Sequence, residues 1–201
     1  MSKFGQTQRA IYGQIHVALT ILAYQDEVHF QQATTVTRKW ALKGSAPEVK
    51  SPSGKRSLAY SGFVFPKNGQ LIMTKPDWFK YDTVIASIRE FLSLIELEAN
   101  QMLHLVLDNA PWHKKAIRLI EDTNNTEYAD IRAKVRFIRM PPYSPDLNPI
   151  EQVWRITRRE VTHNRYFKTL DLLAKKLDSY FEKLSVPNPK LMDLCLFKYK
   201  S

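Results

Sequence analysis

The sequence lacks paired cysteines, a long apolar run and internal repeats, and each absence excludes a class of proteins. Cys195 is the single cysteine, so an internal disulfide and a cysteine-rich zinc site are both excluded. The longest apolar run, Val17 to Tyr24, is interrupted by Thr20 and is too short to span a membrane. Asp26 and Glu27 follow it where a signal peptide would have a small-residue cleavage site. These absences predict a protein of the reducing cytoplasm.

Acidic side chains are scarce relative to basic ones. The 201 residues include 30 Lys and Arg against 20 Asp and Glu, a formal net charge of +10. The excess runs through the whole sequence rather than a tail, with a local concentration between Trp154 and Lys168. Such a charge favours a polyanionic partner, with nucleic acid first and an acidic membrane surface second. A basic protein without such a partner is the alternative.

The length suits one domain, residues 1–201, and the pattern of apolar residues predicts a mixed α/β fold. We expect strands at 17–25, 35–42, 57–65, 70–74, 102–107 and 135–140, and helices at 79–99, 114–122, 149–163 and 170–184. Residues 123–130 read as a polar loop, 141–149 as a proline-rich turn, and the residues from 187 as a tail or docking segment. An antiparallel start of three strands, followed by alternating helices and strands, is the order of ribonuclease-H-like folds, with helices on both faces of the sheet.

Three acidic residues occupy places where ligands bind in such sheets. Asp26 ends the first apolar strand, Asp108 follows the strand at 102–107, and Glu151 lies in the first turn of a helix. Strand ends gather at one edge of an open sheet, and carboxylates gathered there suit Mg²⁺ or Mn²⁺. Two such ions about 4 Å apart serve phosphoryl transfer without a nucleophilic side chain. The three acids therefore predict phosphodiester chemistry.

Each acid also has a purely structural interpretation. Asp26 could begin a turn, and Asp108 could cap the helix that follows it. Glu151 could close a capping box with Asn148 or pair with Arg155 one turn along the helix. Taken singly, each acid is better explained by structure than by catalysis.

Four sequence words around the acids change this balance. They are QDEVHF at 25–30, TRKWA at 37–41, LVLDNAPWH at 105–113 and MPPYSPDLNPIEQVW at 140–154. In this order they closely resemble the DDE endonuclease domain of bacterial insertion-sequence transposases of the mariner superfamily, over roughly residues 15–185. The long proline-rich word is the most specific of the four. The interval from Asp108 to Glu151 is longer than we expect for this family, and we place the surplus at residues 123–130.

The resemblance implies a role for five residues. Asp26, Asp108 and Glu151 match the catalytic, metal-binding acids, and the resemblance implies Mg²⁺ or Mn²⁺ as cofactor, with two ions in the site. Asn109 and His113 match polar residues that accompany the second aspartate, as supporting or DNA-contacting groups. A packing role for His113 is the alternative.

The activity implied is metal-dependent cleavage of DNA at insertion-sequence ends and strand transfer to a target. The expected partners are both DNAs and a second copy of the chain in a homodimer, with no membrane partner. The strand that carries Asp26 begins too early to leave room for the family's N-terminal helix-turn-helix domain. We therefore expect that domain to be absent and a separate helix-turn-helix polypeptide to bind the ends. The expected location is the bacterial cytoplasm, at the nucleoid when DNA is bound.

Candidate DNA contacts form two basic strips, for which a solvated surface is the alternative. They are Lys114, Lys115 and Arg118 after the second aspartate, and Arg155, Arg158 and Arg159 after Glu151. Trp40, Trp78 and Trp112 could stack on bases, although aromatic residues more often belong to the core.

Two rival functions remain open at this point. One is a ribonuclease-H-like nuclease or junction resolvase that cuts DNA without joining it. The other is a non-catalytic, DNA-binding transposase remnant, against which the presence of all three acids argues.

Overall fold

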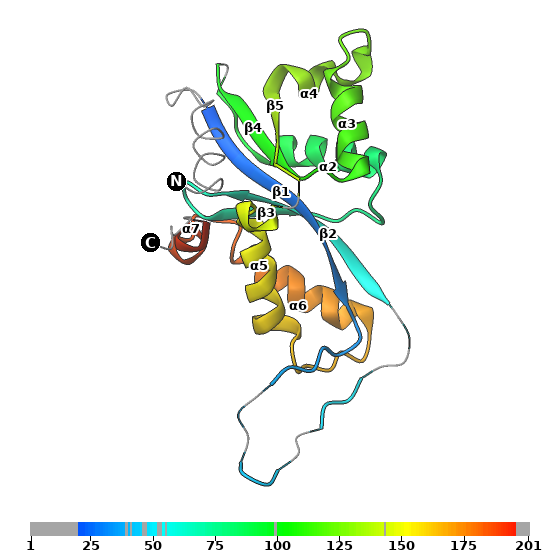
Figure 1. Ribbon diagram of the computed structural model, residues 1–201, viewed down its shortest axis with the longest axis vertical. Helices are drawn as coiled ribbons and strands as arrows, with labels where there is room; N and C mark the ends of the chain where they lie inside the picture. The colour runs from blue at the N-terminus through cyan, green and yellow to red at the C-terminus, as the bar shows by residue number, and fades with distance from the viewer. Residues whose placement is uncertain are drawn as a thin grey trace.

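A computed structural model describes residues 20–195, apart from residues 39, 41, 46, 47, 52, 53, 55, 99 and 143. Its centre is a five-stranded sheet in the order β3-β2-β1-β4-β5 (Figure 1). The strands are β1 Thr20–Gln31, β2 Ser57–Phe65, β3 Gln70–Thr74, β4 Met102–Leu107 and β5 Val135–Arg139. The first three strands pair antiparallel, and β1, β4 and β5 pair parallel. The predicted mixed α/β, ribonuclease-H-like sheet is confirmed.

Helices cover both faces of the sheet. They are α2 Tyr81–Leu94, α3 Pro111–Glu121, α4 Ala129–Lys134, α5 Ile150–Thr157, α6 Leu170–Glu182 and α7 Pro189–Cys195. Three short turns join them: η1 Thr126–Tyr128, η2 Pro145–Leu147 and the π-helical η3 Arg158–Thr162. In Figure 1, α2 to α4 lie around β4 and β5, while α5 to α7 lie around the other half of the molecule. The sheet is thus the middle of three layers.

Two hydrophobic cores follow from the alternation of side chains along the strands. Ala23 and Leu105 are buried in the core with α2 and α3, whereas their neighbours Tyr24 and Val106 are buried in the core with α5 and α6. Consecutive residues of a strand point to opposite faces, so a strand covered on both sides is apolar at every position. This explains the continuous apolar run that predicted β1.

The strand predictions need two corrections. β1 continues to Gln31, so Asp26 lies inside the strand and not at its end. The extension exists because β2 pairs with it from Tyr24 to Gln31. The predicted strand at 35–42 is wrong, since the described residues between 32 and 56 form no strand and lie in an irregular arm (Figure 1). Val36 and Trp40 are exposed there, without a partner strand or a core to pack on.

Other predicted boundaries shift by local chemistry. The loop at 123–130 contains η1 and the start of α4, where Asp130 pairs with Arg89 at 3.0 Å. The tail includes α7, and α5 changes to a π-helical turn at Arg158, where the His163 amide donates to the Arg158 carbonyl at 2.7 Å. The turn between β2 and β3 contains Asn68-Gly69, a pair typical of tight hairpins, with Gly69 at a φ of +70°.

Some predictions fall outside the described residues: the start of the first strand at 17–19, residues 39 and 41 of the second sequence word, 52 and 53 of a turn, and 143 of the proline-rich word. Among the residues that are described, none of the helices is both long enough and apolar enough to cross a bilayer.

Candidate active site

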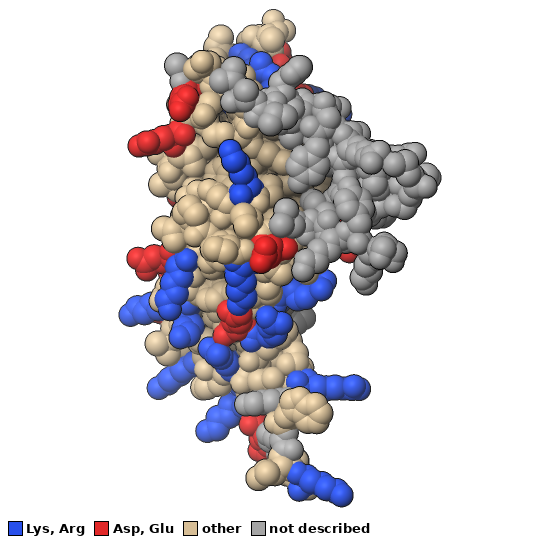
Figure 2. Space-filling view, turned by 90° about the vertical axis from the view of Figure 1, so that its left-hand side faces the viewer, with Lys and Arg blue, Asp and Glu red and all other residues tan. Residues whose placement is uncertain are grey.

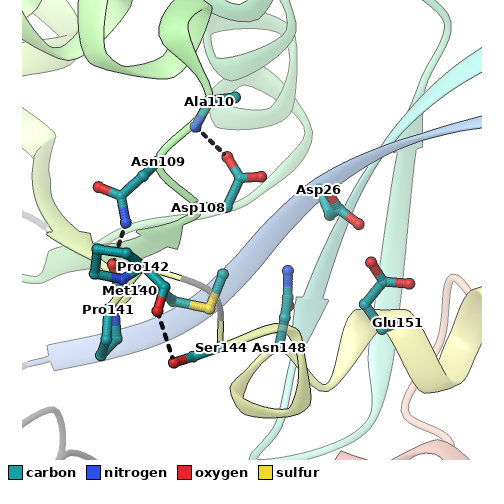
Figure 3. A pocket seen from close by; sticks show the side chains of 10 residues that line it. All are labelled: Asp26, Asp108, Asn109, Ala110, Met140, Pro141, Pro142, Ser144, Asn148 and Glu151. Carbon is teal, nitrogen blue, oxygen red and sulfur yellow. Dashed lines mark hydrogen bonds between the residues drawn. The ribbon is translucent and has the colours of Figure 1, made fainter.

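The three predicted acids line one cavity of about 270 Å³. Asp26 comes from β1, Asp108 from the turn after β4, and Glu151 from the first turn of α5. In Figure 3 the carboxylates of Asp26 and Glu151 turn toward one another, and Asp108 faces the cavity from the other side. The remaining lining residues belong to the turn after β4 and the proline-rich segment: Asn109, Ala110, Met140, Pro141, Pro142, Ser144 and Asn148.

The sheet register explains why the two aspartates meet. Tyr24 of β1 pairs with Val106 of β4 in a parallel ladder. Asp26 and Asp108 each stand two residues further along, so they reach the same level on neighbouring strands. β4 ends at Leu107, so Asp108 faces the cavity from the turn that follows the strand. Asp26, in contrast, faces the cavity from within β1.

Asp26 is held from the α5 side. The Trp154 indole donates its Nε1–H to Asp26 Oδ2 at 3.0 Å. The pKa of Asp26 is raised to about 7: burial is the largest cause, the charges of Glu151 and Glu27 add to it, and the Trp154 hydrogen bond opposes it. Glu151 adds to the shift through its negative charge, and within the described residues no ion pair of Asp26 or Glu151 offsets that charge.

A glycine on β2 makes room for this contact. Gly62 pairs with Asp26 across the antiparallel ladder. A Cβ atom at Gly62 would lie 2.4 Å from Trp154 Cη2 and 3.1 Å from Ile150 Cδ1. The indole therefore reaches Asp26 only because position 62 carries no side chain. The sequence pattern placed Trp154 in an apolar helix stripe and gave no signal for this role.

Asp108 is held from the α3 side. Its Oδ1 accepts hydrogen bonds from the Ala110 amide at 2.9 Å and from His113 Nδ1 at 2.5 Å. The described hydrogen bonds to this side chain all use Oδ1, which leaves Oδ2 toward the cavity. Burial raises the pKa of Asp108, but the bonds from His113 and Ala110, with the charges of His113 and Lys114, outweigh it and lower the pKa overall. Asp108 is thus ionised and fixed.

His113 links Asp108 to a further acid, Glu27. The imidazole is fully buried, and its Nε2 lies 2.8 Å from Glu27 Oε1. Because carboxylates only accept, both ring nitrogens donate and the ring is an imidazolium. Burial lowers the pKa of His113, yet the two carboxylates raise it to about 9. Trp112 Nε1 also contacts Glu27 at 3.4 Å. Glu27 was missed in the sequence, although it directly follows Asp26.

Asn109 and Asn148 each hydrogen-bond to backbone groups beside the cavity. Asn109 donates from Nδ2 to the Met140 carbonyl, so it ties the proline-rich segment to β4. Asn148 Oδ1 accepts from the Ile150 amide at 3.4 Å, and α5 begins at Ile150. Among the described hydrogen bonds and ion pairs, none joins the Glu151 carboxylate to Asn148 or Arg155. The structural interpretations of Glu151 therefore receive no support.

The chemistry of the cavity fits a hard divalent cation. Three carboxylates line it, and no Lys or Arg does, although the whole chain carries a net charge of +10. The side chains are not gathered into a finished site, since no group of three His, Cys, Asp or Glu residues in the described part of the chain is close enough to hold one metal ion.

The basic strips and tryptophans lie on the surface to different degrees. Lys114, Lys115 and Arg118 are exposed on α3. Arg155 on α5 and Arg159 in η3 are also exposed. Arg158 is half-buried over the Phe30 ring. Figure 2 shows Lys and Arg gathered on the lower half of one face, at the level of α5 and α6. Trp40 is fully exposed and Trp78 is half-exposed, whereas Trp112 is partly buried against Glu27.

Comparison with known proteins identifies a family and several relatives. The family model described as DDE superfamily endonuclease matches residues 21–174. The insertion element IS630 uncharacterized 39 kDa protein of Shigella sonnei is 23% identical over 162 residues, which are 81% of this chain and 45% of that protein. The uncharacterized protein y4pE/y4sA of Sinorhizobium fredii (strain NBRC 101917 / NGR234) is 29% identical over 112 residues, 55% of this chain and 75% of that protein.

Solved structures share the fold. The chain in the crystal structure of the Mos1 strand transfer complex superposes with a TM-score of 0.62 at 14% identity, over 94% of this chain and 55% of that chain. The Mos1 mariner paired end complex with Mn gives 0.61 at 15% identity, over 93% and 54%. This chain spans about half the length of the Mos1 chains and of the Shigella sonnei relative. Because the family model covers well over half of the sequence, the predicted family is confirmed, and the chain belongs to the DDE superfamily endonucleases.

Proposed function

We propose that this domain is the catalytic domain of an insertion-sequence transposase, which cuts DNA at the element ends and joins the freed end to a target. The observation that carries the proposal is the single cavity lined by Asp26, Asp108 and Glu151, in a DDE endonuclease fold. The relationship to an insertion-element protein and the fold shared with Mos1 support the transposase assignment over other nucleases.

The three carboxylates are the proposed ligands of Mg²⁺ or Mn²⁺, with two ions in the working site. Divalent ions held there would make the attacking oxygen more nucleophilic and neutralise charge on the leaving oxygen. His113 and the Ala110 amide fix Asp108 through Oδ1, so that Oδ2 is presented to the cavity. Trp154 fixes Asp26 through Oδ2 in the same way. Glu151, whose carboxylate has no such contact among the described residues, is the acid that moves to complete the site.

The proline-rich segment positions Glu151. Pro141 and Pro142 restrict the backbone where the chain leaves β5, and Asn109 anchors the preceding Met140 carbonyl. The segment then leads directly into α5. A rigid approach fixes where the helix begins and therefore how far Glu151 is from the two aspartates.

The decisive experiment supplies a blunt oligonucleotide with a 3′-hydroxyl end, a supercoiled plasmid target and Mn²⁺. The proposal expects plasmid joined to the oligonucleotide, and loss of that product in Asp26→Asn, Asp108→Asn and Glu151→Gln. Plasmid nicking without joined product would identify a nuclease that cuts only. DNA binding with neither product, and no change in the Asp108→Asn variant, would identify a non-catalytic remnant.

The remaining predictions concern the assembly. We propose that the working unit is a homodimer on DNA and that a helix-turn-helix region on a separate polypeptide reads the element ends. We also propose that residues 1–201 form one catalytic domain acting at the nucleoid. The mass of the DNA-bound complex measured by light scattering tests the dimer.

A further inference from the structure

A second hollow lies beside the candidate active site, along the exposed face of α3. Its volume is about 870 Å³, and four cationic side chains line it: Lys114, Lys115, Arg118 and Arg139. The first three come from α3, and Arg139 comes from the end of β5. Glu121 and Asp122 also line it, where α3 ends. The hollow is therefore basic toward the start of α3 and acidic at its far end.

The hollow and the active-site cavity adjoin at two places, where consecutive residues of the chain line one and then the other. Ala110 lines the cavity and the next residue, Pro111, lines the hollow. Arg139 lines the hollow and the next residue, Met140, lines the cavity. A DNA strand that leaves the cavity between Ala110 and Met140 would therefore pass Pro111 and Arg139 and enter the hollow at its basic end.

The four cations are available to a ligand. All four are exposed, and in the described part of the chain none of them forms an ion pair. Lys115 Nζ lies 3.6 Å from the centre of the Tyr81 ring, so its direction is set by a cation–π contact. Within the residues that the structure describes, the other three have no such contact and can turn toward a bound phosphate.

The spacing matches a sugar–phosphate backbone rather than a small anion. Lys114 and Arg118 are four residues apart on α3, so they stand on one side of the helix about 6 Å apart. Arg139 adds a third cation from the neighbouring strand end. Each of the three cations can contact one phosphate. Lys114 is also close enough to the cavity for its charge to lower the pKa of Asp108.

We propose that Lys114, Arg118 and Arg139 form a phosphate track that holds the backbone of the DNA strand next to the phosphate that reacts. The inference rests on the proposed function, because it takes the cavity to be the place of phosphodiester chemistry. The track reads no bases, since Lys and Arg on phosphates fix position without carrying sequence information. Its contribution to binding depends on salt, because phosphate contacts release counterions.

The test measures DNA binding without catalysis. Binding of a fluorescein-labelled 20-mer duplex of arbitrary sequence is followed by anisotropy in EDTA, at several salt concentrations, for the triple variant Lys114→Ala, Arg118→Ala, Arg139→Ala. We expect about tenfold or greater weakening in low salt and a salt slope reduced by about 2 to 3. The matched control, Lys175→Ala, Lys176→Ala, Lys183→Ala, removes three exposed cations from α6 and its end, on the other face of the sheet. It should change binding less than twofold.

A charge-retaining variant separates electrostatics from folding. Lys114→Arg, Arg118→Lys, Arg139→Lys should bind like the wild type, and all variants should keep the wild-type circular dichroism spectrum. Equal weakening by the track variant and the α6 control, or an unchanged salt slope, would overturn the track. If the wild type neither nicks nor joins plasmid with Mn²⁺ while the track variant still loses binding, the proposed function fails, and only a DNA-binding role of the three cations, without a reacting phosphate beside them, survives. If the wild type joins DNA and the track variant binds normally, the track fails alone.

Discussion

The Trp154 indole donates to Asp26 Oδ2 at 3.0 Å across the surface of Gly62, the ladder partner of Asp26 on β2. A helix residue, a strand acid and a glycine on the next strand are thereby fixed as one unit. Trp154 belongs to the same helix as Glu151, so this contact also sets the position of the third acid. The packing of the core and the geometry of the candidate site therefore depend on the same contact.

Gly62→Ala should damage both stability and activity. The new methyl group would meet Trp154 at 2.4 Å and Ile150 at 3.1 Å, so α5 must shift away from the sheet. Overpacking of this kind costs about 1–3 kcal/mol. Urea unfolding should show that loss, and DNA joining should fall by a larger factor than stability explains. The control is Gly44→Ala, where a Cβ meets nothing within 4 Å although the φ of +86° strains the backbone locally; it should leave joining intact, and normal joining by Gly62→Ala would contradict the prediction.

Trp154→Phe should weaken the site while keeping most of the packing. The substitution removes the donor to Asp26 but retains an aromatic ring among Phe30 and Phe181. Asp26 then loses its hydrogen bond and its orientation, and we expect a 10- to 100-fold loss of Mn²⁺ affinity or joining rate, the range typical of residues that support metal ligands. Mn²⁺ titration followed by electron paramagnetic resonance measures the first. Phe181→Leu, a core change without polar loss, should leave Mn²⁺ affinity unchanged.

The metal-free protein should become less stable as the pH rises, and Asp26 should be a main cause. Burial raises the pKa of this carboxyl from 3.8 to about 7 in the folded state. The folded protein then holds a proton that the unfolded chain has released, so this stabilising term is complete below about pH 4 and is lost as the pH rises through 7. Its loss amounts to at most about 4 kcal/mol.

Asp26→Asn removes that dependence. In EDTA, we expect the variant to unfold at a higher temperature than the wild type at pH 8, with the difference shrinking toward pH 4. Scanning calorimetry at intermediate pH values gives the curve. Parallel pH dependence of the two proteins would mean that Asp26 is not the titrating group. Added Mg²⁺ should stabilise the wild type only, because the variant lacks one carboxylate ligand.

Glu27→Gln should loosen Asp108 through His113. Glu27 accepts from His113 Nε2 at 2.8 Å, and His113 in turn donates to Asp108. The neutral amide no longer stabilises the imidazolium, so the short bond to Asp108 weakens. The expected readout is an upfield shift of the His113 ring N–H proton in the NMR spectrum, with a roughly 10-fold loss of Mn²⁺ affinity. An unchanged proton resonance would show that Glu27 does not act through His113.

Much of this protein follows from local sequence. The bounds of β2, β3 and β4 agree with the predicted strands, because each is a short apolar or alternating run between clear turn signals. The motif words identified the family and singled out three acids that line one cavity. Boundaries set by neighbours were missed, as at 35–42, where a strand-like pattern has no strand beside it.

The sequence by itself determined the class of fold and the family and singled out three acids that line one cavity, because strand periodicity, turn chemistry and the proline-rich approach to Glu151 act over a few residues. Tertiary structure alone decided that β1 runs past Asp26, that Gly62 admits Trp154, that Glu27 reaches Asp108 through His113, and that Arg139 joins the cations of α3. These relationships join residues distant in sequence, and whether such residues meet depends on strand pairing and on the packing of helices against both faces of one sheet.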